Sequence, residues 1–317
     1  MPSELATLAW IATDEIPSEQ AAEWLATNPS PDDIAYLQYT SGSTGKRKGT
    51  KITHANVMAN SRMIAQAANH DDTLVGVSWL PPEHDMGLVG SILQPLAVGG
   101  QITLMAPFSF LRSPISWLNV ISAIKATSCP APNFAYRRCA QIPPARIPGS
   151  LDLSSWRVAY CGAEPIQNNT LCEFARVFAP YGFRKKTFYP CYGLAEGTLI
   201  LTGSDVSETY RTLPAPDISG TATEREWVSC GRPIPPGEAL VVDPDTRCVL
   251  AEGKIGEIWA QGPHISPGYW GRENDDTFGN RLADGQGPFL RTGDLGFLNT
   301  GELFVTGRTS DIIIMRG

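Results

Sequence analysis

The sequence lacks the cysteine patterns that hold small secreted folds together. Its seven cysteines are an odd number among 317 residues, and no two of them form a CxxC pair. This argues against a disulfide framework and against a zinc site, and it fits a reducing compartment, so we expect a cytoplasmic protein. The cysteines are Cys129, Cys139, Cys161, Cys172, Cys191, Cys230 and Cys248.

Signals for export or membrane insertion are also missing. The N-terminus reads Met-Pro-Ser-Glu-Leu, without a basic region before an apolar stretch, so we expect no signal peptide. Residues 86–111 carry no charge, but glutamine, proline and glycine interrupt them, which would be costly in a helix that faces lipid. We interpret this stretch as a buried helix over residues 87–97, a Gly-Gly turn, and a buried strand Gln101–Ala106.

Positive charge is scarce, and one common catalytic pattern is absent. The chain has 25 Lys and Arg against 32 Asp and Glu, a net charge of −7, which disfavours broad affinity for nucleic acid. Any anion-binding site must therefore be local. No GxSxG elbow occurs, so a serine hydrolase of that kind has no support. The length allows roughly two domains.

Two patterns of secondary structure divide the chain. Residues 33–200 alternate between buried strands and amphipathic helices, which is typical of an α/β fold with a mostly parallel sheet and flanking helices. After a polar loop over 204–227, short strands and turns predict a small, mainly antiparallel or β-barrel-like subdomain. We expect an α/β core over 1–203 and a β-rich subdomain over 204–306. The predicted strands are Ile34–Tyr39, Val77–Leu80, Gln101–Ala106, Val158–Cys161, Thr187–Tyr192, Ala239–Val242, Gly256–Gln261, Phe289–Arg291 and Glu302–Thr306. The predicted helices are Asn56–Ala68, Pro114–Ala126 with Ser113 as its N-cap, and Asn168–Phe178, which runs toward a stop at Gly182.

A dense group of phosphate-binding residue types follows the first predicted strand. Four hydroxyls, two glycines and three cations fall within residues 40–48. Glycines let backbone amides turn toward an anion, hydroxyls add donors, and cations neutralise charge, so the segment predicts a polyphosphate site. It matches neither a Walker A loop nor GxGxxG, and the alternative is a polar surface turn before a helix. The expected binding residues are Thr40, Ser41, Gly42, Ser43, Thr44, Gly45, Lys46 and Lys48.

Four further motifs follow in order along the chain. They are Gly162-Ala163-Glu164-Pro165, Tyr192-Gly193-Leu194-Ala195-Glu196, Arg291-Thr292-Gly293-Asp294 and Gly307-Arg308-Thr309-Ser310-Asp311. Together with the glycine-rich loop they resemble the adenylate-forming enzymes, a superfamily of acyl-CoA synthetases, luciferases and nonribosomal peptide adenylation domains. The resemblance covers about residues 33–317, the middle of the family. Relatives carry a longer N-terminal portion and a mobile C-terminal domain, both expected to be absent here, so 307–317 would begin the hinge.

The resemblance implies a role for each motif. Gly162, Ala163 and Glu164 would form the turn that contacts adenine, and Tyr192, followed by Gly193, would stack on the base. Glu196 would be the Mg²⁺ ligand, Asp294 would accept from both ribose hydroxyls, and Arg308 would contact ribose or phosphate. His84 would lie beside the reacting carboxylate and phosphate, and Gly193 would also lie near the substrate. Asp311 would be the hinge.

Each of these residues also has a purely structural interpretation. Glu196 is a strand-end carboxylate in solvent, Tyr192 an ordinary core tyrosine, Asp294 a turn-forming aspartate, and His84 a structural histidine. Residues His54, His70 and His264 have no motif around them.

The resemblance also implies a reaction, in which a substrate carboxylate attacks the α-phosphorus of ATP and pyrophosphate leaves. Ala195 and the segments around Pro81–Leu88 and Ala131–Tyr136 are similar to the fatty acyl-AMP ligase branch. Asn133 and Phe134 would then line the acyl pocket, or alternatively only begin a core helix. That branch transfers its product to an acyl carrier protein.

Several alternatives stay open at this stage. The stretch Thr212–Trp227 is short where the branch has an insertion that excludes CoA, so CoA is a possible acceptor. The chain is alternatively a non-catalytic ATP-binding remnant, or an amino-acid adenylation domain, although the expected aspartate near Asn133–Tyr136 is missing. Relatives use a lysine from the C-terminal domain during adenylation, so the chain by itself is expected to be weakly active. Acyl chain length and oligomeric state do not follow from the sequence.

Overall fold

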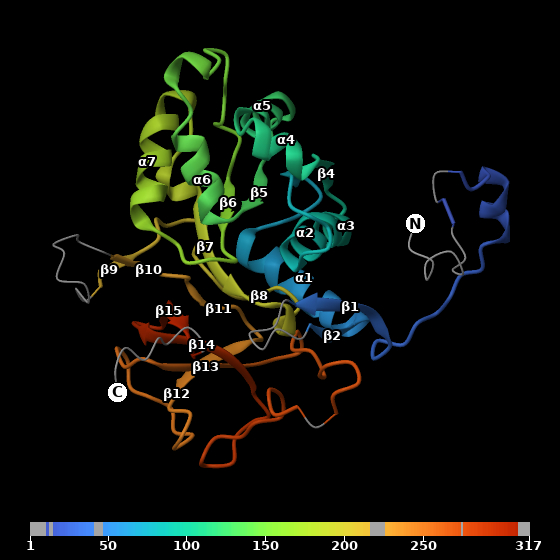
Figure 1. Cartoon of the computed structure of the whole chain (residues 1–317), viewed down its shortest axis with the longest axis vertical. Coiled ribbons are helices and arrows are strands. Elements are labelled where there is room, and N and C mark those ends of the chain that lie inside the picture. Colours follow the sequence, from blue (N-terminus) through green and yellow to red (C-terminus); the bar gives the residue numbers. More distant parts are fainter. Residues whose placement is uncertain (1–10, 13–14, 41–46, 216–225, 274, 310–317) are drawn as a thin grey trace, which may run out of the picture.

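A seven-stranded sheet forms the centre of the protein (Figure 1). The structure, a computed structural model, describes residues 11–12, 15–40, 47–215, 226–273 and 275–309. Neighbouring strands from β7 to β4 are parallel, whereas β8 and β11 are antiparallel, which confirms the predicted mostly parallel α/β sheet. In spatial order the strands are β11 (Arg232–Pro233), β8 (Ile200–Gly203), β7 (Phe188–Gly193), β6 (Val158–Cys161), β5 (Ser128–Ala131), β3 (Val75–Ser78) and β4 (Gln101–Leu104).

Helices cover both faces of this sheet, with α1 to α3 on one side and α6 and α7 on the other (Figure 1). Along β6, Val158 and Tyr160 pack on the α1 side, whereas Ala159 and Cys161 join an aromatic core on the other side. A strand covered on both faces is apolar at every position, which is why β6 was recognisable. The helices are α1 (His54–Ala68), α2 (Asp85–Leu88), α3 (Gln94–Val98), α4 (Pro107–Arg112), α5 (Ile115–Ile124), α6 (Asn133–Ala140) and α7 (Asn168–Phe178).

The helix ends follow local capping chemistry, with one correction to the predictions. Thr53 and Asn56 form a reciprocal capping box that starts α1. Gly182 stops the turn after α7 in the left-handed conformation, with φ of 87°, as predicted. The predicted N-cap of α5 at Ser113 is wrong, because Pro114 takes that position and no side chain caps the helix. Short 3-10 turns occupy η2 (Ser18–Glu23), η4 (Pro144–Arg146), η5 (Ala179–Tyr181), η6 (Lys185–Thr187) and η7 (Ala195–Gly197).

The charge-free segment over residues 86–111 contains a helical run and a strand, as predicted, but with two differences. The π-helical η3 (Val89–Leu93) separates α2 from α3, just before Pro95, whose ring nitrogen cannot donate to the ladder. The strand β4 is mostly exposed, not buried, because it lies at the sheet edge and pairs only with β3. Within the described ranges, no helix has the length and hydrophobicity to cross a membrane.

A hairpin holds the two ends of the predicted phosphate loop together. Strands β1 (Ile34–Thr40) and β2 (Lys48–Thr53) are antiparallel, and Thr40 pairs with Lys48. The sequence predicted β1 but not β2, because the cations and glycine of β2 were assigned to the loop. Residues 41–46, which include Ser41, Gly42, Ser43, Thr44, Gly45 and Lys46, lie outside the described residues.

A second sheet of four antiparallel strands packs against β7 and β8 (Figure 1). Tyr192 and Leu201 of the large sheet share a buried cluster with Ile258 and Leu303 of the small one. The small sheet confirms the predicted β-rich part, although β11, also from that part, joins the large sheet. The strands of the small sheet are β12 (Glu238–Val242), β13 (Gly256–Gln261), β14 (Leu290–Asn299) and β15 (Glu302–Arg308). A separate antiparallel pair, β9 (Thr212–Pro214) and β10 (Glu226–Val228), lies at the end of the polar loop that was predicted over 204–227.

Candidate active site

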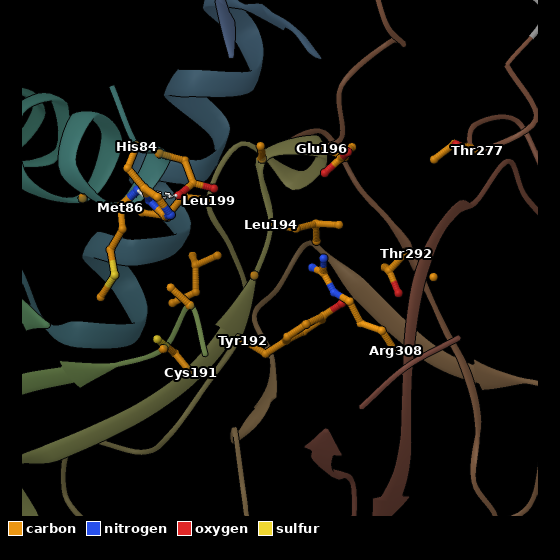
Figure 2. A pocket seen from close by; sticks show the side chains of 18 of the residues that line it. His84, Met86, Cys191, Tyr192, Leu194, Glu196, Leu199, Thr277, Thr292 and Arg308 are labelled. Atoms are coloured by element: carbon orange, nitrogen blue, oxygen red, sulfur yellow. Dashed lines mark hydrogen bonds and ion pairs between the residues drawn. The ribbon is translucent and has the colours of Figure 1, made fainter. Parts of the chain in front are cut away.

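A cavity of about 480 Å³ lies where the ends of β6 and β7 approach β14 and β15. Figure 2 shows Met86 and Leu199 toward one end of it, and Thr292 and Arg308 toward the other. The apolar lining is Ile64, Met86, Pro130, Tyr160, Leu199 and Ile200; the polar lining includes Lys48, His84, Glu196, Glu257, Tyr269, Thr277, Arg291, Thr292 and Arg308. One end of the cavity therefore suits a hydrocarbon and the other a polar, charged ligand.

Backbone at the ends of β6 and β7 forms part of the cavity wall. Gly162 and Ala163 follow β6 and line the cavity, and Ala163 has a positive φ of 65°. Gly193 ends β7, where an added Cβ would lie 1.7 Å from the carbonyl oxygen of Leu199, so only glycine fits there. Glu164 is exposed and is not part of the lining; its Oε1 accepts a 2.5 Å hydrogen bond from the backbone N–H of Phe134.

Tyr192, Asp294 and Arg308 form one hydrogen-bonded group between the two sheets. The Tyr192 hydroxyl donates to Oδ2 of Asp294 at 2.7 Å, and Nε of Arg308 donates to Oδ1 at 2.6 Å. Asp294 is only 4% exposed, and it pairs directly with Arg308 across β14 and β15. Burial, and then the Asp294 carboxylate, raise the pKa of Tyr192 well above its usual range, so the phenol stays neutral.

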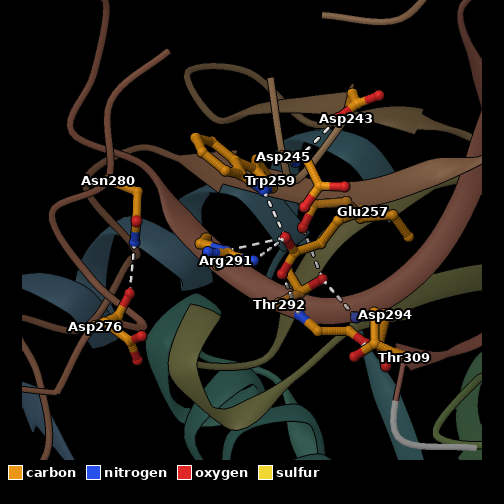
Figure 3. Close-up of polar contacts among 12 residues, drawn as sticks. Asp243, Asp245, Glu257, Trp259, Asp276, Asn280, Arg291, Thr292, Asp294 and Thr309 are labelled. Carbon is orange, nitrogen blue, oxygen red and sulfur yellow. Dashed lines mark hydrogen bonds and ion pairs between the residues drawn. The ribbon is translucent and has the colours of Figure 1, made fainter. Parts of the chain in front are cut away.

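A buried glutamate holds the part of β14 that carries the Arg291–Asp294 motif (Figure 3). Glu257 is 3% exposed, and its Oε2 accepts from Nε of Arg291 at 2.9 Å and from Nε1 of Trp259 at 3.0 Å. Its Oε1 accepts from the backbone N–H of Gly293 at 3.2 Å. These contacts satisfy a buried charge and fix the turn immediately before Asp294.

Glu196 lies at the polar end of the cavity, close to a tyrosine and a lysine. The Tyr269 hydroxyl donates to Oε1 of Glu196 at 2.6 Å. Nζ of Lys48 lies 4.5 Å from the centre of the Tyr269 ring and 3.0 Å from Oδ2 of Asp275. Burial, and then Glu196, raise the pKa of Tyr269, so this phenol remains a donor.

His84 stands at the cavity wall with a carboxylate beside it. Its Nδ1 is 2.7 Å from Oδ1 of Asp85 and 3.2 Å from the backbone nitrogen of Met86. The two contacts require different protonation of Nδ1, and we favour donation to Asp85, because Met86 N–H also reaches Oδ1 of Asp85 at 2.6 Å. The hydrogen bond to Asp85 raises the pKa of His84 above its usual value.

Other predicted site residues lie elsewhere. Asn133 begins α6 and is 4% exposed, and its Oδ1 accepts from the backbone N–H of Gln167. The Phe134 ring packs edge-on against Trp79. Neither Asn133 nor Phe134 is among the cavity-lining residues, so their contact with an acyl chain stays a prediction. Asp311 lies outside the described residues.

Several lining residues had no motif to reveal them, among them Tyr160, Glu257 and Tyr269. Glu257 had one usable signal, a carboxylate inside the apolar strand Gly256–Gln261, where an unpaired charge would be costly. Tyr160 and Tyr269 reach the cavity only through tertiary packing.

The family follows from comparison with known proteins. A family model described as "AMP-binding enzyme" matches residues 4–270. The chain belongs to this family. Solved structures of AMP-binding enzymes have the same fold as this chain. The fatty acyl-adenylate ligase from L. pneumophila, in complex with acyl adenylate and pyrophosphate, has a TM-score of 0.89 and 42% identity, over 96% of this chain and 56% of that one.

Among AMP-binding enzymes, the curated relatives agree with the predicted branch. The medium-chain-fatty-acid–[acyl-carrier-protein] ligase JamA of Moorena producens is 41% identical over 333 aligned residues, 100% of this chain and 56% of the relative. The long-chain-fatty-acid–AMP ligase FadD32 of Mycolicibacterium smegmatis is 35% identical over 340 aligned residues, which cover 97% of this chain and 53% of the relative. They confirm the resemblance to fatty acyl-AMP ligases, although this AMP-binding chain spans about half the length of either relative.

Proposed function

We propose that the protein activates a fatty acid with ATP, forming acyl-adenylate and releasing pyrophosphate. The cavity carries this proposal, because one space joins an apolar end to a polar end lined by residues from all five motifs. The relatives named as fatty acid ligases support it. We also propose that the α/β core over 1–203, the subdomain over 204–306 and the hinge at 307–317 act together, since residues from all three parts line the cavity.

The polar end would bind the nucleotide. The ring of Tyr192 and the turn Gly162–Ala163 provide a flat apolar face and backbone for adenine. The Asp294 carboxylate, already fixed by Tyr192 and Arg308, is a strong acceptor for ribose hydroxyls. Lys48, at the end of the phosphate loop, would neutralise phosphate charge once it leaves Asp275.

The residues present fit a magnesium ion at Glu196. Mg²⁺ is usually held by one or two carboxylates together with phosphates and water, not by an all-protein cage. Glu196 supplies one carboxylate at the polar end, and Tyr269 orients it through Oε1. When bound, the ion would neutralise charge on the phosphate oxygens.

Positioning accounts for the reaction, without a protein nucleophile. An oxygen of the fatty acid carboxylate forms a bond to the α-phosphorus while the bond from that phosphorus to the bridging oxygen breaks, and pyrophosphate leaves with the electron pair. His84, with its raised pKa, can carry a positive charge beside the reacting carboxylate and phosphate. Holding both anions in line supplies the rate enhancement.

The acyl group would pass to an acyl carrier protein, as the name of JamA states for that relative. CoA is the second candidate acceptor, favoured by the short stretch Thr212–Trp227, where the branch has an insertion that excludes CoA. Trapping adenylates with hydroxylamine across fatty acids of different length, in a protein with its neighbouring segments, tests the activation step. If no acid yields a hydroxamate, the proposed activation step is overturned. Offering carrier protein or CoA to the same preparation identifies the acceptor.

Changing Asp294 to asparagine should weaken AMP binding by about ten- to a hundredfold. Asparagine keeps the shape but loses the charge that pairs with Arg308, and a charge-assisted hydrogen bond contributes about 1.5–3 kcal/mol. Calorimetric titration of AMP into the chain measures the change. Asp243→Asn is the matched control, a partly exposed turn residue of the same subdomain whose carboxylate accepts from the nearby backbone amides of Asp245 and Thr246. Equal AMP affinity in both variants would contradict the ribose assignment.

A further inference from the structure

The apolar end of the cavity lies on the α1 face of the large sheet. Ile64 of α1, Met86 of α2 and Ile200 of β8 all line it, and all belong to one buried cluster with Tyr160 of β6. Burying methylenes against such side chains is favourable and has no directional requirement. This end is therefore where an acyl chain would run, on the opposite side of the sheet from the aromatic core.

Tyr160 of β6 lines the cavity and belongs to the buried cluster at this apolar end. Its ring lines the cavity, while its hydroxyl lies 3.4 Å from Nε2 of His70, a residue that does not line the cavity. The same Nε2 lies 3.1 Å from Oγ of Ser128, the first residue of β5. The Tyr160 side chain thus points away from the nucleotide end and toward the amino ends of the strands, and its ring packs edge-on against Tyr189.

The imidazole behind the ring is neutral. Burial lowers the pKa of His70 to about 4, so the imidazole is uncharged near neutral pH. His70 directly follows Asn69, the left-handed cap that ends α1, and it is partly exposed. The Tyr160 ring therefore lies between the apolar end of the cavity and the partly exposed His70 near the amino ends of the strands.

We infer that Tyr160 sets the longest acyl chain that the cavity accepts, by closing its apolar end against His70. This inference rests on the proposed function and names the residue that decides the substrate range. Each methylene buried before the ring should improve affinity by about fourfold, and the gain should stop where the chain meets the ring.

The test is a chain-length profile of binding. Non-hydrolysable acyl adenosine sulfamates, with even-numbered chains from hexanoyl to hexadecanoyl, are titrated by calorimetry into wild type and into Tyr160→Ala and Tyr160→Leu. Both substitutions remove the ring, so the affinity optimum should move to longer chains in each. Tyr160→Phe keeps the ring and should keep the wild-type optimum. Gly90→Val adds volume to the cavity wall beside Leu199, and should move the optimum to shorter chains.

Leu171→Ala is the control for lost stability, because Leu171 is fully buried on the other face of the sheet and does not line the cavity. Its optimum should equal that of wild type. Folded Tyr160→Ala or Tyr160→Leu protein with an unchanged optimum overturns the inference but leaves the proposed function intact. A wild-type chain that binds no analogue overturns the proposed function, and this inference with it.

Discussion

Replacing Glu196 with glutamine should reduce adenylate formation at saturating Mg²⁺ by about a hundredfold, equal to about 2.7 kcal/mol. Glutamine has the same shape and still accepts the hydrogen bond from Tyr269, so the local fold should persist. It lacks the negative charge that binds a hard cation. Pyrophosphate release, measured over a range of Mg²⁺ concentrations in a protein that includes its neighbouring segments, shows the effect as lower turnover and a higher Mg²⁺ requirement.

Glu208→Gln provides the matched control for this experiment. Glu208 is exposed in a turn after β8 and does not line the cavity, so its turnover and Mg²⁺ requirement should equal those of wild type. If Glu196→Gln also keeps the wild-type Mg²⁺ dependence, Glu196 is a strand-end carboxylate and not a metal ligand.

Replacing Glu257 with alanine should lower the free energy of unfolding by about 3 kcal/mol. The change leaves the Arg291 guanidinium, the Trp259 N–H and the Gly293 amide without their shared acceptor in a largely buried place. Urea unfolding followed by tryptophan fluorescence measures the shift in midpoint. AMP affinity should fall as well, because the turn before Asp294 loses its anchor.

Glu238→Ala is the comparison for this effect, since Glu238 belongs to the same sheet but is exposed. Its unfolding free energy should stay within about 0.5 kcal/mol of wild type. Glu257→Gln retains a hydrogen-bond acceptor, so its free energy of unfolding should lie between those of Glu257→Ala and Glu238→Ala. Equal unfolding midpoints for Glu257→Ala and Glu238→Ala would show that the network adds no net stability.

The sequence predicted those elements whose residues carry their own signal. β6 was recognisable because both of its faces are buried, and the end of α7 because Gly182 takes a left-handed conformation. β2 was missed because Lys48 and Gly49 read as loop, and only pairing with β1 makes them a strand. β5 was missed because Ser128-Cys-Pro-Ala has weak strand propensity, and its burial depends on its neighbours.

The residues of the site also divide into those with a sequence signal and those without one. Gly193 and Asp294 were predicted from the resemblance of the motifs around them, and the structure places Gly193 in the cavity lining and Asp294 beside it, in contact with Tyr192. Tyr160 and Tyr269 were not, since an isolated aromatic residue has no sequence signal that distinguishes the core from a cavity wall. Glu164 was predicted at the adenine turn, but its carboxylate accepts a hydrogen bond from the backbone N–H of Phe134. Phe134 lies 30 residues away, at the positive N-terminal end of α6, and the sequence gives no sign of this contact.

The pairing of Thr40 with Lys48 has a thermodynamic consequence for ligand capture. Bringing the ends of a chain segment together costs entropy, and that cost normally falls on whatever ligand organises the segment. The β1–β2 ladder already brings the two ends together during folding, so in the proposed function less of this entropy cost would oppose phosphate binding. Weakening the ladder at its open end would therefore reduce nucleotide affinity without removing any group that touches the nucleotide.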